Sequence, residues 1–142
     1  MSKKKVLFVC IHNSARSQMA EAFLEKYTNK KITVKSAGLT PGKLNPIVVK
    51  VMNEIGIDIS KKKTNSVDEF WNKNIKFDYV ITVCDEANAE KCPIFPGSNV
   101  LHWGFTDPSG LDGNEKEKIK NTRLIRDEIK YKIKEWMKKE SF

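Results

Sequence analysis

Apolar residues along this chain fall into two patterns, short continuous runs and longer stretches with helical spacing. The short runs are rich in β-branched residues, which is typical of strands buried on both faces of a parallel sheet. They predict four strands, over residues 5–10, 32–37, 78–84 and 99–103. Apolar residues recur every three or four positions elsewhere, which predicts helices over 17–27, 45–56, a short segment from 66, and about 114–139. The stripe predicted for the last helix consists of Ile119, Thr122, Ile125, Ile129, Ile133 and Trp136.

Local signals support the ends of two of these helices. Asn45-Pro46 combines a capping residue with proline at the first helical position, and Gly56 follows the last apolar residue of that stretch. Ser66 and Glu69 have the spacing of a capping box, which predicts a third, short helix.

The order strand, helix, strand, helix, helix, strand, strand, helix predicts an α/β fold with a four-stranded parallel sheet and helices on both faces. Ligands of such sheets bind beyond the carboxyl ends of the strands, where the strand order reverses. Cys10 and Cys84 both stand at such ends. A chain of 142 residues can bury a core without metal or disulfide, so we expect one domain over residues 1–142.

Composition indicates a soluble cytoplasmic protein, with 39% hydrophobic and 31% charged residues. Its apolar runs fall short of the roughly 18 residues that span a membrane. Lysines at 3–5 precede an apolar stretch at 6–9, but this stretch is too short for a signal peptide. We expect a monomer without membrane contact.

The net charge of +8 comes from 26 lysines and arginines against 18 acidic residues. Only three of these basic residues are arginines, and the lysines are interspersed with glutamates. This pattern favours a solvated lysine-rich surface over a nucleic-acid site. The positive field would still attract a small anion.

Three cysteines, Cys10, Cys84 and Cys92, are an odd number that does not suit a disulfide framework. Cys84 and Cys92 are too far apart for a zinc knuckle, and no paired histidine or cysteine completes a four-ligand set. Buried thiols or redox chemistry remain as explanations.

The strongest motif is Cys-x5-Arg-Ser, with Cys10, Arg16 and Ser17 at a predicted strand-to-helix junction. A tight loop there turns its backbone amides inward and forms an anion site beside the positive helix end. Arg16 adds a planar two-pronged donor, the positive surroundings favour the Cys10 thiolate, and Ser17 can hydrogen-bond its sulfur. The alternative, a cysteine that only ends a buried strand, does not explain the spacing. The amides of this oxyanion loop belong to Ile11, His12, Asn13, Ser14, Ala15 and Arg16.

A second feature is Asp107-Pro108, after the last predicted strand. A group leaving a tetrahedral centre needs a proton donor, and an aspartic acid can serve. An Asp-Pro pair is also a common turn. The Cys-x5-Arg-Ser loop favours the catalytic interpretation.

Together these motifs resemble the low-molecular-weight tyrosine phosphatase family, over essentially the whole chain. The resemblance implies that family's three-layer, flavodoxin-like fold. It also implies a phosphatase-like mechanism in which Cys10 is the nucleophile and Asp107 the general acid.

The segment from Cys84 to Cys92 resembles the redox segment of the thioredoxin-coupled arsenate reductases, which share this fold. Further matching segments are 36–38, 56–60 and 102–108. The resemblance implies that Cys10 attacks arsenate, Cys84 then attacks Cys10, Cys92 attacks Cys84, and thioredoxin reduces the final disulfide. Phosphate and sulfate would bind as analogues of arsenate. Ser109 stands where tyrosine phosphatases of the family usually carry an aromatic residue.

Two other functions stay open at this point: a tyrosine phosphatase using Cys10, Arg16 and Asp107, and an oxyanion-binding module without turnover. In either case Cys84 and Cys92 would be two core thiols.

The resemblance requires no cofactor but implies a potassium ion at Asn13, Glu21 and Ser36. Some members add an aspartate, where this chain has Asn65. For the histidines and tryptophans we expect structural roles. We expect His12 to shape the loop, His102 to pack in the fourth strand, and Trp71, Trp103 and Trp136 to be buried or half-buried.

Overall fold

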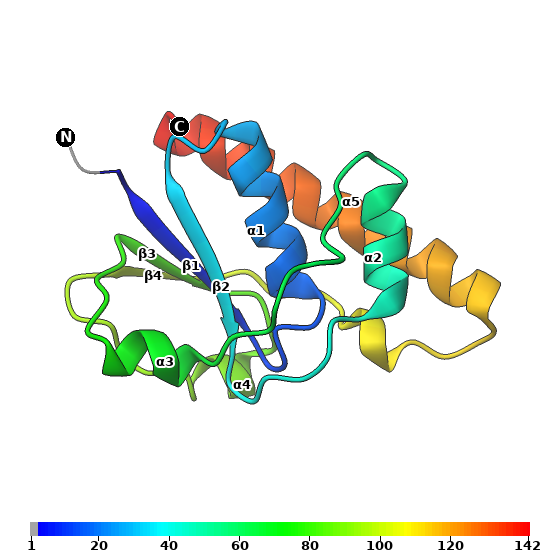
Figure 1. The fold of residues 1–142 in the computed structure, drawn as a ribbon, viewed down its shortest axis with the longest axis horizontal. Coiled ribbons are helices and arrows are strands. Elements are labelled where there is room, and N and C mark those ends of the chain that lie inside the picture. The colour runs from blue at the N-terminus through cyan, green and yellow to red at the C-terminus, as the bar shows by residue number, and fades with distance from the viewer. Residues whose placement is uncertain (1–2) are drawn as a thin grey trace.

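A computed structural model describes residues 3–142 (Figure 1). Its centre is one parallel sheet of four strands, in the order β2-β1-β3-β4. The strands are β1 (Lys5–Cys10), β2 (Thr33–Gly38), β3 (Tyr79–Thr82) and β4 (Asn99–His102). The predicted fold class is thereby confirmed.

The strand order reverses at β1, because the chain adds β2 on one side of it and later returns to add β3 on the other. Val9 pairs with Ala37 of β2 and with Thr82 of β3. The carboxyl ends of β1 and β3 therefore lie side by side at the point where this fold class binds its ligands.

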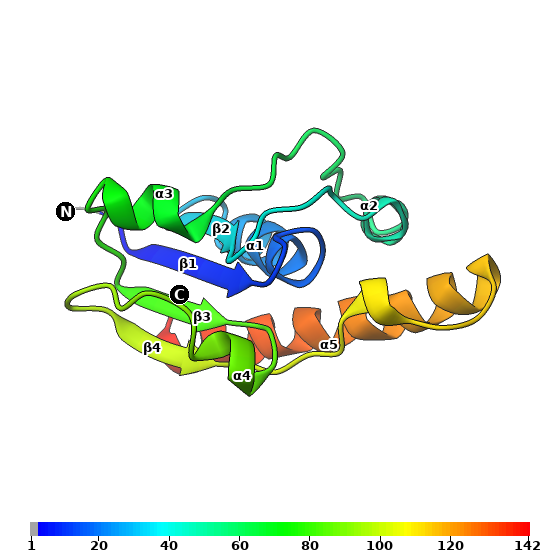
Figure 2. The same cartoon turned by 90° about the horizontal axis from the view of Figure 1, so that it is seen from below.

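Helices cover both faces of the sheet (Figures 1 and 2). They are α1 (Arg16–Tyr27), α2 (Pro46–Asn53), α3 (Val67–Asn72), α4 (Glu86–Ala89) and α5 (Glu115–Glu140), with a short 3₁₀ turn at Pro108–Gly110. Side chains of β1 alternate between two cores, since Val6 and Phe8 pack with α1, α2 and α5 while Leu7 and Val9 pack toward α3.

The longest helix follows its predicted apolar stripe. The buried residues of α5 include every predicted stripe position: Ile119, Thr122, Ile125, Ile129, Ile133 and Trp136. At the start of α2, Asn45 caps the helix by accepting from the amides of Ile47 (2.9 Å) and Val48 (3.3 Å). Ser66 caps α3 in the same way through Asp68 N.

Several expectations were wrong in detail. β3 ends at Thr82, two residues before its predicted end, and α2 ends at Asn53, before Gly56. Trp71 is 48% exposed on the six-residue α3, whereas Trp103 and Trp136 are buried as expected. None of the helices between residues 3 and 142 has the length and apolarity needed to cross a bilayer.

Candidate active site

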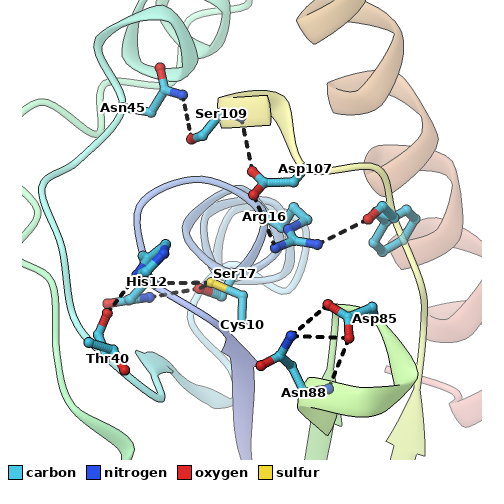
Figure 3. A network of polar contacts seen from close by, with 12 residues as sticks. Cys10, His12, Arg16, Ser17, Thr40, Asn45, Asp85, Asn88, Asp107 and Ser109 are labelled. Atoms are coloured by element: carbon cyan, nitrogen blue, oxygen red, sulfur yellow. Dashed lines mark hydrogen bonds and ion pairs between the residues drawn. The ribbon is translucent and has the colours of Figure 1, made fainter. Parts of the chain in front are cut away.

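Cys10 ends β1, and its thiol lies at the bottom of the loop that leads into α1 (Figure 3). The side chain is buried, with 2% exposed. Its Sγ accepts a hydrogen bond from the backbone amide of Asn13 at 3.1 Å and lies 2.9 Å from Ser17 Oγ. Both partners suit a sulfur that carries negative charge.

The loop carbonyls are directed away from the thiol. Cys10 O, Ile11 O and His12 O accept hydrogen bonds from the amides of residues 39, 40 and 42, and Ser14 O accepts one from Asn45. A trans peptide unit points its N–H opposite to its C=O. The amides that follow these carbonyls therefore face the inside of the loop, as an anion-binding nest requires.

Asn13 holds the loop in this form. Its φ is 54°, a left-handed conformation that asparagine tolerates better than most residues. Its Nδ2 donates to Ser17 Oγ at 2.7 Å. Its Oδ1 accepts from Gln18 Nε2 at 3.2 Å and from Asn65 N at 2.8 Å. A fully buried side chain thus links the loop to α1 and to the segment before α3.

Gly38 lies directly under the loop. A Cβ there would be 2.7 Å from Asn13 N and 2.8 Å from both His12 C and Ile11 O. Such distances to backbone atoms leave no room for a side chain, so glycine permits β2 to support the loop so closely.

Arg16 opens α1, and its guanidinium is buried beside the thiol (Figure 3). NH1 donates to Phe105 O at 3.1 Å, and NH2 lies 3.7 Å from Asp107 Oδ2. The loop amides, the positive end of α1 and this guanidinium can together neutralise a tetrahedral oxyanion.

Asp107 stands at the start of the 3₁₀ turn, and it reaches the site through its contact with Arg16. Its Oδ1 accepts from Ser109 N at 2.9 Å, and Ser109 Oγ is hydrogen-bonded to Asn45 Nδ2 at 3.0 Å. Asn45 therefore joins the start of α2 to the aspartate turn. Sequence reasoning treated it only as a helix cap, and nothing in its local sequence indicates this second contact.

Cys84 is fully buried two residues beyond β3. Val83 N donates to Val9 O at 2.8 Å, so Cys84 follows directly on the strand end that neighbours Cys10. Burial raises the pKa of the Cys84 thiol, and the positive charge of Arg16 partly offsets this rise. Cys92 follows α4 and is half-buried.

The residues of the implied potassium site are already engaged with other protein groups. Ser36 Oγ donates to Glu21 Oε1 at 2.5 Å, and Lys62 Nζ lies 3.2 Å from Glu21 Oε2. Asn65 turns its Nδ2 to Ser36 O at 3.1 Å. A lysine ammonium thus neutralises the one carboxylate of the set, and the residues do not fit a potassium ion.

The two histidines differ in whether the structure confirms their expected positions. The Nδ1 of His12 lies 2.8 Å from Thr40 O, a contact that anchors the loop as expected. His102 lies in β4 but is exposed rather than packed, because β4 is an edge strand, and its Nδ1 lies 2.8 Å from Thr82 Oγ.

Comparison with known proteins agrees with this geometry. The profile of the family described as "Low molecular weight phosphotyrosine protein phosphatase" matches residues 5–141. An arsenate reductase from Halalkalibacterium halodurans is 43% identical over 135 residues, covering 94% of this chain and 95% of the relative. A solved arsenate reductase in its oxidised state is 30% identical with a TM-score of 0.80, over 96% of this chain and 98% of that one.

A third similar protein is the thioredoxin-dependent arsenate reductase of Corynebacterium glutamicum. It is 30% identical with a TM-score of 0.62, over 93% of this chain and 62% of that one. The extent of these matches places the protein: it belongs to the low molecular weight phosphotyrosine protein phosphatase family, in the branch of the arsenate reductases.

Proposed function

We propose that this protein reduces arsenate to arsenite through a relay of its three cysteines. The observation that carries the proposal is the placement of Cys10 and Cys84 at neighbouring strand ends, with Cys92 eight residues further along the same segment. A phosphatase needs only the first thiol, whereas reduction needs a second thiol to take part in a disulfide.

In the first step the loop amides and Arg16 hold arsenate against Cys10. The thiolate attacks arsenic, and Asp107 protonates the oxygen that leaves as water.

In the second step Cys84 attacks the sulfur of the Cys10 adduct. A Cys10–Cys84 disulfide forms, the S–As bond breaks, and its electron pair leaves with arsenic as arsenite. Cys92 then attacks Cys84, so that the disulfide moves to Cys84–Cys92 and Cys10 returns as a thiolate. The pair of electrons spent on arsenic comes from two thiols of this chain.

A dithiol reductant must then restore Cys84 and Cys92. Thioredoxin is the proposed reductant, because the Corynebacterium glutamicum relative is described as thioredoxin-dependent. Cysteines that return to the thiol state in every cycle require a reducing compartment, and we place the protein in the cytoplasm.

A phosphatase side activity would use the same loop, with Cys10, Arg16 and Asp107. Ser109 favours reduction as the main activity, because its small side chain offers no ring on which a tyrosyl substrate could stack.

The test is arsenate-dependent NADPH oxidation coupled through thioredoxin and thioredoxin reductase, run beside a glutaredoxin system. We expect turnover with thioredoxin that is lost in Cys10→Ser, Cys84→Ser and Cys92→Ser. Turnover at the parent rate in Cys84→Ser or Cys92→Ser would refute the relay.

A further inference from the structure

A cavity of about 380 Å³ opens beside Cys92, between β3, β4 and the segment that contains α4. Its lining includes Thr82, Glu86, Glu90, Cys92, Val100 and His102. It lies away from the oxyanion loop, since no residue of that loop lines it. The cavity brings the last thiol of the proposed relay together with an imidazole that the proposed mechanism has not used.

Cys92 has to ionise before it can attack a disulfide, because the thiolate is the nucleophile. Burial raises the pKa of this thiol to about 11, and the charge of Cys84 adds to the rise. Roughly one Cys92 in ten thousand would then be a thiolate at pH 7. The Cys92 thiol lies 3.6 Å from Pro93 O, to which it donates its proton. The relay therefore needs a proton acceptor near Cys92.

His102 is held with one ring nitrogen engaged and the other available. Nδ1 lies 2.8 Å from Thr82 Oγ, and the Thr82 hydroxyl has a second acceptor in Leu101 O at 3.4 Å. When the hydroxyl proton points to Leu101, Thr82 Oγ accepts from Nδ1–H, and Nε2 is left with a free lone pair.

The free nitrogen and the backbone carbonyl of Cys84 both lie next to Gly104. A Cβ built on Gly104 would lie 3.7 Å from His102 Nε2 and 4.0 Å from Cys84 O. His102 therefore lines the cavity that contains Cys92 and also lies near the backbone of Cys84. A proton acceptor is needed at this place when Cys92 approaches Cys84.

We propose that His102 is the general base that activates Cys92. Nε2 takes the proton of the Cys92 thiol, and the thiolate attacks Sγ of Cys84 in the Cys10–Cys84 disulfide. The Cys84–Cys92 bond forms, the Cys10–Cys84 bond breaks, and Cys10 leaves as a thiolate toward Ser17 and Asn13 N. No outside oxidant or reductant enters this step, which rests on the proposed relay.

Two carboxylates face the same cavity, Glu86 and Glu90, both on the α4 side. Negative charge therefore lines the same cavity in which His102 would become an imidazolium. The neutral Thr82 on the β3 side keeps the ring oriented without adding charge.

The test follows the disulfides formed after one equivalent of arsenate is added without any reductant. Samples of the parent, His102→Gln and Val100→Ala are quenched with acid, and mass spectrometry of their peptides measures each cysteine pair over time. Val100 lines the cavity without a titratable group, so this variant controls for a change in packing.

We expect the parent and Val100→Ala to pass quickly to Cys84–Cys92. His102→Gln should accumulate Cys10–Cys84 and resolve it about 100-fold more slowly at pH 7, within the range of general-base effects. The deficit should shrink as the pH approaches 10, because hydroxide replaces the missing base. Added imidazole should also speed the step in His102→Gln.

A His102→Gln protein that resolves Cys10–Cys84 at the parent rate and with the parent pH profile would overturn the proposal. So would a slow variant that neither imidazole nor higher pH restores, since that behaviour indicates a structural role. A parent that forms no disulfide with arsenate would instead refute the relay itself, so the two failures are distinguishable.

Discussion

Ser17 Oγ lies 2.9 Å from Cys10 Sγ and accepts a hydrogen bond from Asn13 Nδ2 at 2.7 Å. Because Asn13 supplies the proton of that second contact, the proton of the Ser17 hydroxyl is free to point at the sulfur. The arrangement stabilises a thiolate at Cys10 both when it attacks and when it leaves.

Ser17→Ala removes this hydrogen bond to a charged sulfur. A hydrogen bond to a charged group contributes about 1.5–3 kcal/mol, so kcat/KM for arsenate should fall about 10- to 100-fold. Steady-state kinetics measure the effect, and a thermal unfolding curve checks that the variant remains folded. A folded variant with the parent kcat/KM would remove Ser17 from the mechanism.

Arg16→Lys keeps the positive charge but loses the planar fork and its tie to Phe105 O. A lysine cannot contact two oxygens in the same plane, so both oxyanion affinity and rate should fall. Calorimetric titration with phosphate measures the affinity, and we expect a loss of about tenfold or more. Unchanged phosphate affinity would exclude Arg16 from binding.

Cys92 should react with iodoacetamide only at unusually high pH. The thiolate is the reactive form, and burial raises the pKa of Cys92 to about 11, so the rate should climb until about pH 11. In urea-unfolded protein the alkylation rate should level off near pH 8.5, since the ordinary pKa of a cysteine is about 8.5. By linkage, the shift stabilises the fold below about pH 8.5, and this contribution is lost as the pH rises toward 11. Peptide mapping follows the alkylation, and equal profiles for folded and unfolded protein would refute the shift.

The ammonium group of Lys62 should make the parent insensitive to potassium. Potassium chloride and choline chloride at equal ionic strength should give the same Tm and the same phosphate affinity. Lys62→Gln leaves Glu21 without its 3.2 Å partner, so we expect this variant to gain a potassium-dependent rise in Tm. Lys63→Gln, at an exposed neighbouring position, is the matched control. A potassium-specific rise in the Tm of the parent would contradict this account.

The sheet and its helices could be predicted because their signals are local. The run at Lys5–Cys10 is apolar from Val6 onward, and β1 has the predicted bounds. The stripe of α5 repeats over many turns, so six of its buried residues could be predicted, but the buried Arg126 could not. By contrast, α3 has only six residues, too few for the sequence to show which face is exposed. Trp71 was therefore expected to be buried or half-buried, and it is exposed.

Within the site, the Cys-x5-Arg-Ser spacing predicted that Cys10, Arg16 and Ser17 come together, because a loop of that length closes on itself. The contacts that cross the fold could not be predicted. Lys62 meets Glu21 across 41 positions and Asn45 meets Ser109 across 64, and no pattern along the chain pairs them. His102 was expected inside because the sequence does not show that its strand lies at the sheet edge.

The relay is tested most directly by finding which cysteines are paired after a single turnover. One equivalent of arsenate is added to reduced parent, Cys92→Ser and Cys84→Ser without reductant, and disulfides are mapped by mass spectrometry after an acid quench. The account predicts Cys84–Cys92 in the parent, a trapped Cys10–Cys84 in Cys92→Ser, and no disulfide in Cys84→Ser. A Cys10–Cys92 disulfide in the parent, or arsenite released with all three cysteines still reduced, would contradict it.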